Sequence, residues 1–130
     1  MQPVVSRREP PRFLTLWQIR FPIGAIASIG HRVSGVLLLV ALPPLTLALE
    51  RSLHSAAGYA ELLDGLRSAW LAPLVFVAVW AVSHHLLAGI RHLLMDIGIG
   101  SGLRQARGSA WTVVVGALLA AAVTALRWLA

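Results

Sequence analysis

The residues best suited to chemistry lie in the stretch HHLLAGIRHLLMDIG, at positions 84–98, which closes a long apolar run. If that run is an α-helix, one stripe of it holds residues at i, i+3, i+4, i+7 and i+11, which are His85, Ala88, Gly89, His92 and Asp96. A second stripe carries His84 and Arg91. Polar groups inside an apolar helix are expensive to insert into a membrane, so the stretch predicts a compensating partner, and that partner indicates the function.

The chemistry that this stretch favours is haem binding. An imidazole at mid-membrane can be an axial iron ligand, and Gly89, four positions after His85, leaves a gap for a flat macrocycle. Arg32, on the preceding apolar run, costs about 2.5–3.5 kcal/mol to insert, so we expect it to have an anionic partner such as a cofactor carboxylate. The residues alone leave a cofactor site and a proton pathway both open. We expect His84 to be a hydrogen-bonded packing residue.

Composition points to a membrane protein. The chain has 130 residues, of which 58% are hydrophobic and only 16 carry a formal charge, which is too apolar for a soluble domain of this size. Its basic residues are eleven arginines and no lysine, giving a net charge of +6. In a membrane chain such an excess marks cytoplasmic segments, so we expect no nucleic-acid partner. The absence of cysteine excludes disulfides, thiolate metal sites and iron–sulfur ligation by this chain.

The elements that position these residues form one transmembrane domain, 1–130. The sequence predicts an all-α membrane protein with a leader at 1–21 and three spanning helices at 22–49, 70–97 and 110–129. Pro44 is expected to bend or end the first span. Residues 50–69 are polar and predict a loop with room for one short amphipathic helix, in which His54 is a surface residue. A glycine-containing loop is expected at 98–109.

Arginine positions set the predicted topology. The leader has four arginines and the 98–109 loop has two, whereas the two arginines of 50–69 are offset by three acids. The positive-inside rule therefore predicts a cytoplasmic N-terminus and an outer C-terminus. Within the leader, we expect disorder to about Pro11 and then an interfacial segment from Phe13, with Trp17 at headgroup depth. The leader does not resemble a cleavable signal peptide.

Depth arithmetic brings the polar residues of the first two spans together. At 1.5 Å per residue from the predicted cytoplasmic edges, His31 lies ~15 Å deep and His85 ~18 Å deep, near the middle of a ~30 Å hydrocarbon core. On the first span Ser28, His31, Arg32 and Gly35 are spaced as i, i+3, i+4 and i+7, which predicts a single polar face. The two faces predict a polar cavity that opens toward the cytoplasm.

Two motifs resemble a known family. SIGHRVSG at 28–35 is similar to the S-x-x-H-R-x-S/T signature of the cytochrome b subunit of succinate:quinone oxidoreductase, or complex II. HLLAGIRHLLMDIG at 85–98 resembles the family's second signature, H-x-x-x-G-x-R-H-x-x-x-D-x-G, at every fixed position. The leader is also similar, so the resemblance covers about residues 11–98. Gly30, where a larger apolar residue is common, and the pair Pro43 and Pro44 depart from the family pattern.

The resemblance implies a role for each matched residue. His85 would be the axial ligand of haem b, with the second axial histidine supplied by another membrane-anchor subunit. Ser28 and Arg32 would contribute to the quinone pocket, for ubiquinone or menaquinone. The haem propionate region would include His31, Arg32 and Arg91, and His92 and Asp96 would complete the network at its cytoplasmic end. Geometry alone leaves a second reading open, in which His31 and His85 of this chain both bind the iron.

The resemblance also implies an electron-transfer subunit of succinate dehydrogenase in the bacterial inner (cytoplasmic) membrane, or with a matrix-facing N-terminus in a mitochondrion. It would work in a heteromeric helix bundle with an iron–sulfur subunit and a flavoprotein subunit, surrounded by membrane lipid. Three alternatives stay open: an anchor subunit of quinol:fumarate reductase, a purely structural membrane anchor without haem, and a subunit of a proton-conducting transporter.

Overall fold

The structure, a computed structural model, describes residues 20–129, so the predictions for the leader before Arg20 lie outside the described residues. These residues form four α-helices and, within that range, no strand: α1 Ile23–His54, α2 Ala56–Arg67, α3 Ala72–Asp96 and α4 Leu103–Leu129. α1, α3 and α4 are each long and apolar enough to cross a membrane. The prediction of an all-α membrane protein with three spanning helices is confirmed.

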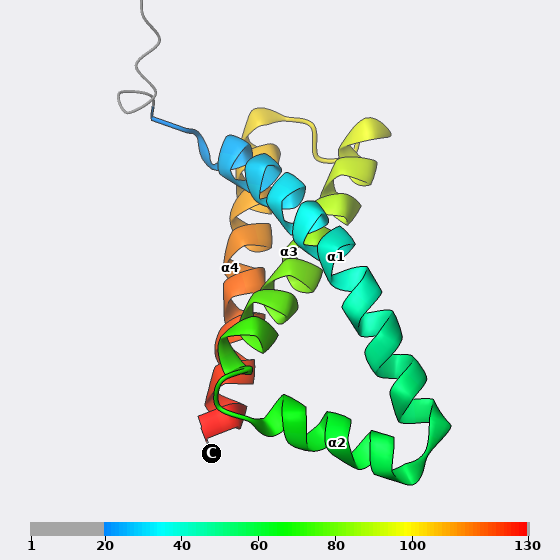
Figure 1. The fold of residues 1–130 in the computed structure, drawn as a ribbon. Coiled ribbons are helices and arrows are strands. Elements are labelled where there is room, and N and C mark those ends of the chain that lie inside the picture. The colour runs from blue at the N-terminus through cyan, green and yellow to red at the C-terminus, as the bar shows by residue number, and fades with distance from the viewer. Residues whose placement is uncertain (1–19, 130) are drawn as a thin grey trace, which may run out of the picture.

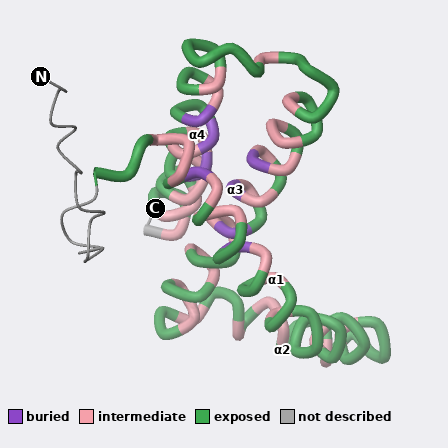
Figure 2. Tube along the Cα trace, turned by 90° about the horizontal axis from the view of Figure 1, so that it is seen from above, coloured by how far each residue is buried: buried purple, intermediate pink, exposed green. Residues whose placement is uncertain are grey.

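Of the three long helices, α3 and α4 pack as a pair, and α1 crosses this pair obliquely (Figure 1). α3 and α4 run antiparallel and lie side by side, while the first half of α1 crosses them and its second half diverges. α2 bridges the open end, between the end of α1 and the start of α3. The buried residues gather where α1, α3 and α4 meet (Figure 2), so the second half of α1 is left exposed by its own chain.

α1 does not end at its prolines, and the helix continues beyond residue 49, where the first span was expected to end. Pro43 and Pro44 lie inside a helix that continues to His54. Each proline removes one backbone donor, which frees the carbonyls of Leu39 and Val40. Membrane helices tolerate this because the surroundings favour helix strongly and hydroxyl side chains supply further hydrogen bonds. Nearby, the Thr46 hydroxyl donates to the Leu42 carbonyl at 2.5 Å, which adds one hydrogen bond to this part of α1.

The polar connection between the first two spans is more helical than expected. Most of it is α2. The residue before this helix, Ser55, caps it, because the Ser55 hydroxyl accepts the backbone N–H of Gly58 at 3.0 Å. Tyr59, Leu62, Leu63 and Leu66 recur at helical spacing on one side of α2, and Glu61 and Asp64 lie on the other. α2 is therefore the short amphipathic helix that the sequence allowed, lengthened at the expense of the loop.

The turn between α3 and α4 is fixed by glycine. Gly98 and Gly100 have positive φ values of 84° and 74°, which other residues rarely adopt. After the C-cap Ile97, the N–H of Gly98 donates to Met95 at 3.0 Å and that of Ile99 to Leu94 at 2.8 Å. This pair of bonds is a Schellman motif and ends α3 where the sequence predicts.

α4 begins at Leu103, before the apolar span expected at 110–129, because a helix can extend beyond the apolar part that crosses the membrane. Its first turns contain Arg104 and Arg107, which are exposed and belong to a good helix-forming segment rather than to a loop. The packing face is made of small residues: Ala110, Val113 and Ala117 are buried. A Cβ at Gly116 would lie 3.1 Å from Leu87 of α3, so the two helices approach closely at this level.

Candidate functional site

Three imidazoles form a row between α1 and α3. The ring of His31 stacks on that of His85, with centroids 4.3 Å apart and planes inclined by 21°, and on that of His92, with centroids 5.1 Å apart. His85 and His92 are two turns apart on one face of α3, so His31 from α1 lies between them. The depth arithmetic thus brought together the histidines of the two spans that the structure places in contact.

Glycines make room for this row. A Cβ at Gly35 of α1 would lie 3.1 Å from Cε1 of His85, so any larger residue would press on that ring. A Cβ at Gly89 of α3 would lie 3.7 Å from Nε2 of His31. The gap that the sequence assigns to a macrocycle at Gly89 therefore lies beneath the His31 ring in this structure.

His85 is held in the tautomer that a metal ligand needs. Its Nδ1 lies 3.2 Å from the His31 carbonyl oxygen and 3.4 Å from the hydroxyl of Ser34. A carbonyl only accepts hydrogen bonds, so Nδ1 carries the proton and Nε2 keeps its lone pair. Ser34 is buried and donates to the same carbonyl at 2.9 Å, which fixes the acceptor. Metal-binding histidines commonly donate their other N–H to a backbone carbonyl in this way.

The stacked pair is incompatible with an iron shared by His31 and His85. A haem bound by two histidines lies between their ligating nitrogens, whereas rings in face-to-face contact leave no layer for a macrocycle. The His, Cys, Asp and Glu side chains between residues 20 and 129 also form no group of three or more able to hold a metal ion directly. Of this stacked pair, His85 is the histidine whose Nδ1 hydrogen bonds suit a metal ligand.

His84, the neighbour of His85, faces a different environment. Its side chain is 2% exposed, and its Nε2 donates to the Ala27 carbonyl of α1 at 3.1 Å. Trp80, one turn earlier on α3, has its ring centroid 5.3 Å away. His84 is thus a hydrogen-bonded packing residue with no open nitrogen at the histidine row, as its sequence position suggested.

Arg32 does not point toward the histidine row. The stripe of α1 that faces α3 contains Ala27, Gly30, His31 and Ser34, so Arg32 is turned outward and exposed. It lies with Val33, Val36 and Leu37 around a shallow apolar hollow on the outer surface of α1. Ser28 is half-buried at the edge of the stripe. Neither side chain has a hydrogen-bond partner within residues 20–129, so both remain available to a molecule or subunit outside this chain.

Arg91 is engaged by α4. Its Nε donates to Ser109 Oγ at 3.1 Å and its Nη2 to the Ala106 carbonyl at 3.2 Å, and Gly24 of α1 lies close to the same guanidinium. Sequence reasoning missed Ser109. The signal was an intramembrane arginine that needs an acceptor, together with a serine at the start of the next span at a similar predicted depth.

The remaining network residues are separated. His92 Nδ1 donates to the Ala88 carbonyl at 2.6 Å within its own helix. Asp96, at the end of α3, is exposed, and its carboxylate has no partner in the described part of the chain. His92 therefore belongs to the histidine row through its contact with His31, whereas Asp96 lies apart from the row at the exposed end of α3.

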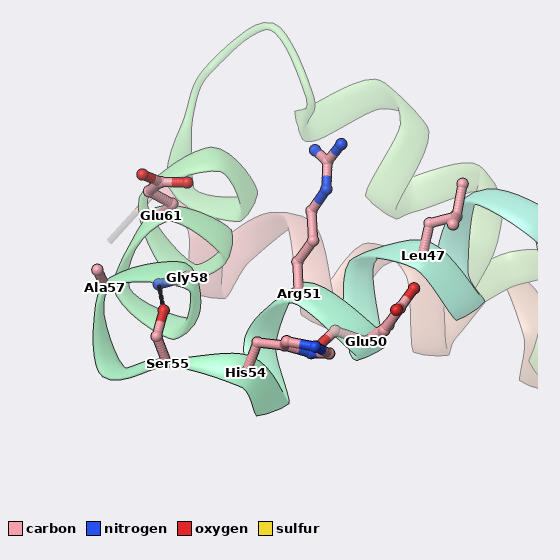
Figure 3. A pocket seen from close by; sticks show the side chains of 8 residues that line it. All are labelled: Leu47, Glu50, Arg51, His54, Ser55, Ala57, Gly58 and Glu61. Atoms are coloured by element: carbon pink, nitrogen blue, oxygen red, sulfur yellow. Dashed lines mark hydrogen bonds between the residues drawn. The ribbon is translucent and has the colours of Figure 1, made fainter.

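A second hollow lies at the opposite end of the molecule, between the end of α1 and the start of α2 (Figure 3). Glu50, Arg51, His54 and Glu61 lie around it, and all four are exposed. At Gly58, which also lines the hollow, an added Cβ would overlap the Arg51 carbonyl. This hollow is a surface corner of the fold and shares no residue with the histidine row.

Fold and site define an integral membrane helix bundle with a row of histidines between its first and second spans. The chain belongs to the family described as succinate dehydrogenase/fumarate reductase transmembrane subunit, which matches residues 6–124. It is 39% identical over 111 residues to the succinate dehydrogenase cytochrome b556 subunit of Coxiella burnetii, covering 85% of this chain and 89% of that one. It is 32% identical to the protein of the same name from Paracoccus denitrificans, over 92% of each chain. It is also 33% identical to the succinate dehydrogenase hydrophobic membrane anchor subunit of Halobacterium salinarum, over 79% of this chain and 80% of that one.

Proposed function

We propose that this chain is the cytochrome b membrane-anchor subunit of a succinate:quinone oxidoreductase, with His85 as an axial ligand of haem b. The observation that carries the proposal is the hydrogen bond from His85 Nδ1 to the His31 carbonyl, which leaves the Nε2 lone pair for iron. The relatives named cytochrome b556 subunits support a b-type haem. When bound, haem b stores and passes single electrons, and its potential depends on its axial ligands and nearby polar groups.

The second axial histidine comes from another subunit. His31 is stacked on His85, and His84 is enclosed against Ala27, so neither is placed to bind the opposite side of the same iron. The exposed second half of α1 supports a partner helix: Leu39 and Val40 are 67% and 68% exposed. A bundle that leaves such a helix uncovered fits a heteromeric assembly with a second membrane anchor, an iron–sulfur subunit and a flavoprotein subunit.

Ser28 and Arg32 contribute to quinone reduction. The Ser28 hydroxyl can donate a hydrogen bond to a quinone carbonyl, and the Arg32 guanidinium can stabilise the negative charge that develops on the reduced ring. Their support is that both lie on the turn of α1 that carries His31, Arg32 on its outer surface, and that neither has a hydrogen-bond partner in the described chain. The quinone is ubiquinone or menaquinone, and it approaches from the cytoplasmic side of the inner membrane.

The haem propionate region includes His31, Arg32 and Arg91, with His92 and Asp96 supporting it toward the cytoplasm. The support differs among them. Arg32 has an unshared guanidinium within residues 20–129, whereas Arg91 already donates from Nε and Nη2 and can offer only its other donors. His31 holds the row together through its two stacking contacts.

The family description names both succinate dehydrogenase and fumarate reductase, and the similar proteins cited above are all named for the former. Succinate oxidation is therefore the proposed direction. The quinone type and the haem midpoint potential distinguish it from quinol:fumarate reduction.

The test is a reduced-minus-oxidised absorption spectrum of the purified complex. The wild type is expected to show b-type bands, and His85→Ala is expected to lose them. His54→Ala, which removes an exposed histidine at the far end of α1, is the matched control and should keep them. A wild-type complex without b-type bands supports the purely structural anchor, and unchanged bands in His85→Ala would exclude His85 as the ligand.

A further inference from the structure

His84 is packed into a space that only glycine provides. A Cβ built on Gly30 of α1 would lie 2.5 Å from Nε2, 2.9 Å from Cε1 and 3.2 Å from Cδ2 of the His84 ring. These separations are below van der Waals contact, so the imidazole lies directly over the Gly30 backbone. Gly30 and His84 are therefore a size-matched pair, in which the absence of one side chain admits the other.

The ring of His84 is oriented by one hydrogen bond. Nε2 lies 3.1 Å from the Ala27 carbonyl oxygen, so Nε2 carries the proton. Nδ1 is buried and has no partner among the described residues. A buried unpaired acceptor is unfavourable, and an apolar ring of the same size would avoid it. The reason for a histidine at this position is therefore the N–H that it donates to the Ala27 carbonyl of α1.

Two consecutive histidines of α3 bind two carbonyls one turn apart on α1. His84 donates to Ala27, and His85 donates to His31. Ala27 O belongs to the peptide group shared with Ser28, and in an α-helix it also accepts the N–H of His31. The two bonds therefore fix both the height and the rotation of the turn that carries Ser28, His31 and Arg32.

We infer that His84 is a positioning residue, which holds this turn of α1 against α3 so that Ser28 and Arg32 face the quinone while His85 faces the iron. The inference rests on the proposed function. It concerns a residue outside the two sequence signatures, and it assigns the Gly30 and His84 pair a role in the geometry of the site.

The test uses the purified four-subunit complex with His84→Phe, His84→Gln and, as control, His54→Phe. Phenylalanine keeps the ring and removes the donor, whereas the glutamine amide can place a donor close to the Nε2 position. His84→Phe should raise the KM for quinone by roughly two- to tenfold, the factor for one neutral hydrogen bond. It should also shift the low-spin haem signal in electron paramagnetic resonance. His84→Gln should restore both, and succinate oxidation with a soluble dye should stay unchanged throughout.

Gly30→Ala supplies an independent arm, including for the case that His84→Phe does not assemble. Its added methyl should reproduce the quinone and haem effects while His84 is present, and Gly30→Ala/His84→Ala should lessen the effect of Gly30→Ala because the clash is gone. Wild-type behaviour of His84→Phe, or a Gly30→Ala effect that the double variant does not lessen, would overturn the inference. A wild-type complex without haem or quinone reduction would instead overturn the proposed function.

Discussion

The rings of His31 and His85 lie face to face, 4.3 Å apart between centroids, and the carbonyl of the same His31 accepts the N–H of the same His85 at 3.2 Å. One residue of α1 therefore controls both the plane and the tautomer of the proposed iron ligand. The backbone part of this control does not depend on the His31 side chain. The ring contact depends on the His31 side chain, and it requires the small residue Gly89 beneath the His31 ring.

Gly89 tests that ring contact through a graded substitution. A Cβ at Gly89 would lie 3.7 Å from His31 Nε2, which is ordinary contact, so we expect Gly89→Ala to retain haem and quinone reduction. Gly89→Leu places further atoms where the His31 ring lies, and we expect it to displace the ring and lower haem content in the purified complex. Overpacking of this kind costs about 1–3 kcal/mol. Equal haem content in the two variants would show that His31 does not occupy this position.

Rates of quinone reduction test the proposed roles of Ser28 and Arg32, which lie on the same turn of α1 as His31. We expect Arg32→Ala to lower kcat/KM for quinone by roughly 10- to 100-fold, because a hydrogen bond to a charged group is worth about 1.5–3 kcal/mol. Ser28→Ala should lower it by about 2- to 10-fold, as for a neutral hydrogen bond. Arg51→Ala removes an exposed arginine at the other end of α1 and is the control. Activity like that of the wild type in both site variants would favour a structural anchor.

Much of the fold and part of the site follow from the sequence. Apolar length predicts the three spans, and Gly98 predicts the end of α3, because each depends on local composition. The shared level of His31 and His85 follows from depth, since antiparallel helices that share a boundary bring equal depths together. Pro44 does not end α1, because a membrane favours unbroken helix more strongly than the surroundings of a soluble helix do.

Rotation about the helix axis was not predictable. Spacing places Ser28, His31, Arg32 and Gly35 within one arc, yet the stripe that contacts α3 is centred nearer Ala27 and Ser34, which turns Arg32 outward. Close packing at Gly30 and Gly35 decides this rotation, and it depends on the facing ring shapes of His84 and His85. Such pairwise fit has no signature in a single sequence.

Variants of Arg91 and Ser109 test whether the packing of α3 on α4 depends on a side-chain hydrogen bond. Arg91→Ala removes both of its bonds to α4, and we expect it to lower the melting temperature of the detergent-solubilised complex, by an amount corresponding to about 1.5–3 kcal/mol. Ser109→Ala removes one bond and should lower it less, by about 0.5–1.5 kcal/mol. A haem midpoint potential that changes in Arg91→Ala and not in Ser109→Ala would support the additional propionate role. Unchanged stability in both variants would contradict the tie to α4.

Pro43 and Pro44 test what covers the second half of α1. Each proline leaves one carbonyl without its helical donor, so Pro43→Ala and Pro44→Ala each restore a hydrogen bond and should stabilise α1, by up to about 3 kcal/mol. The histidine row lies about 18 Å away along the helix, so haem content and quinone reduction should not change. The measurements are the amount of assembled complex in membranes, its melting temperature and its reduced-minus-oxidised spectrum, with Leu45→Ala on the same exposed segment as the control. If either proline variant loses assembly while Leu45→Ala does not, the freed carbonyls of Leu39 and Val40 are acceptors for a partner helix rather than a tolerated defect.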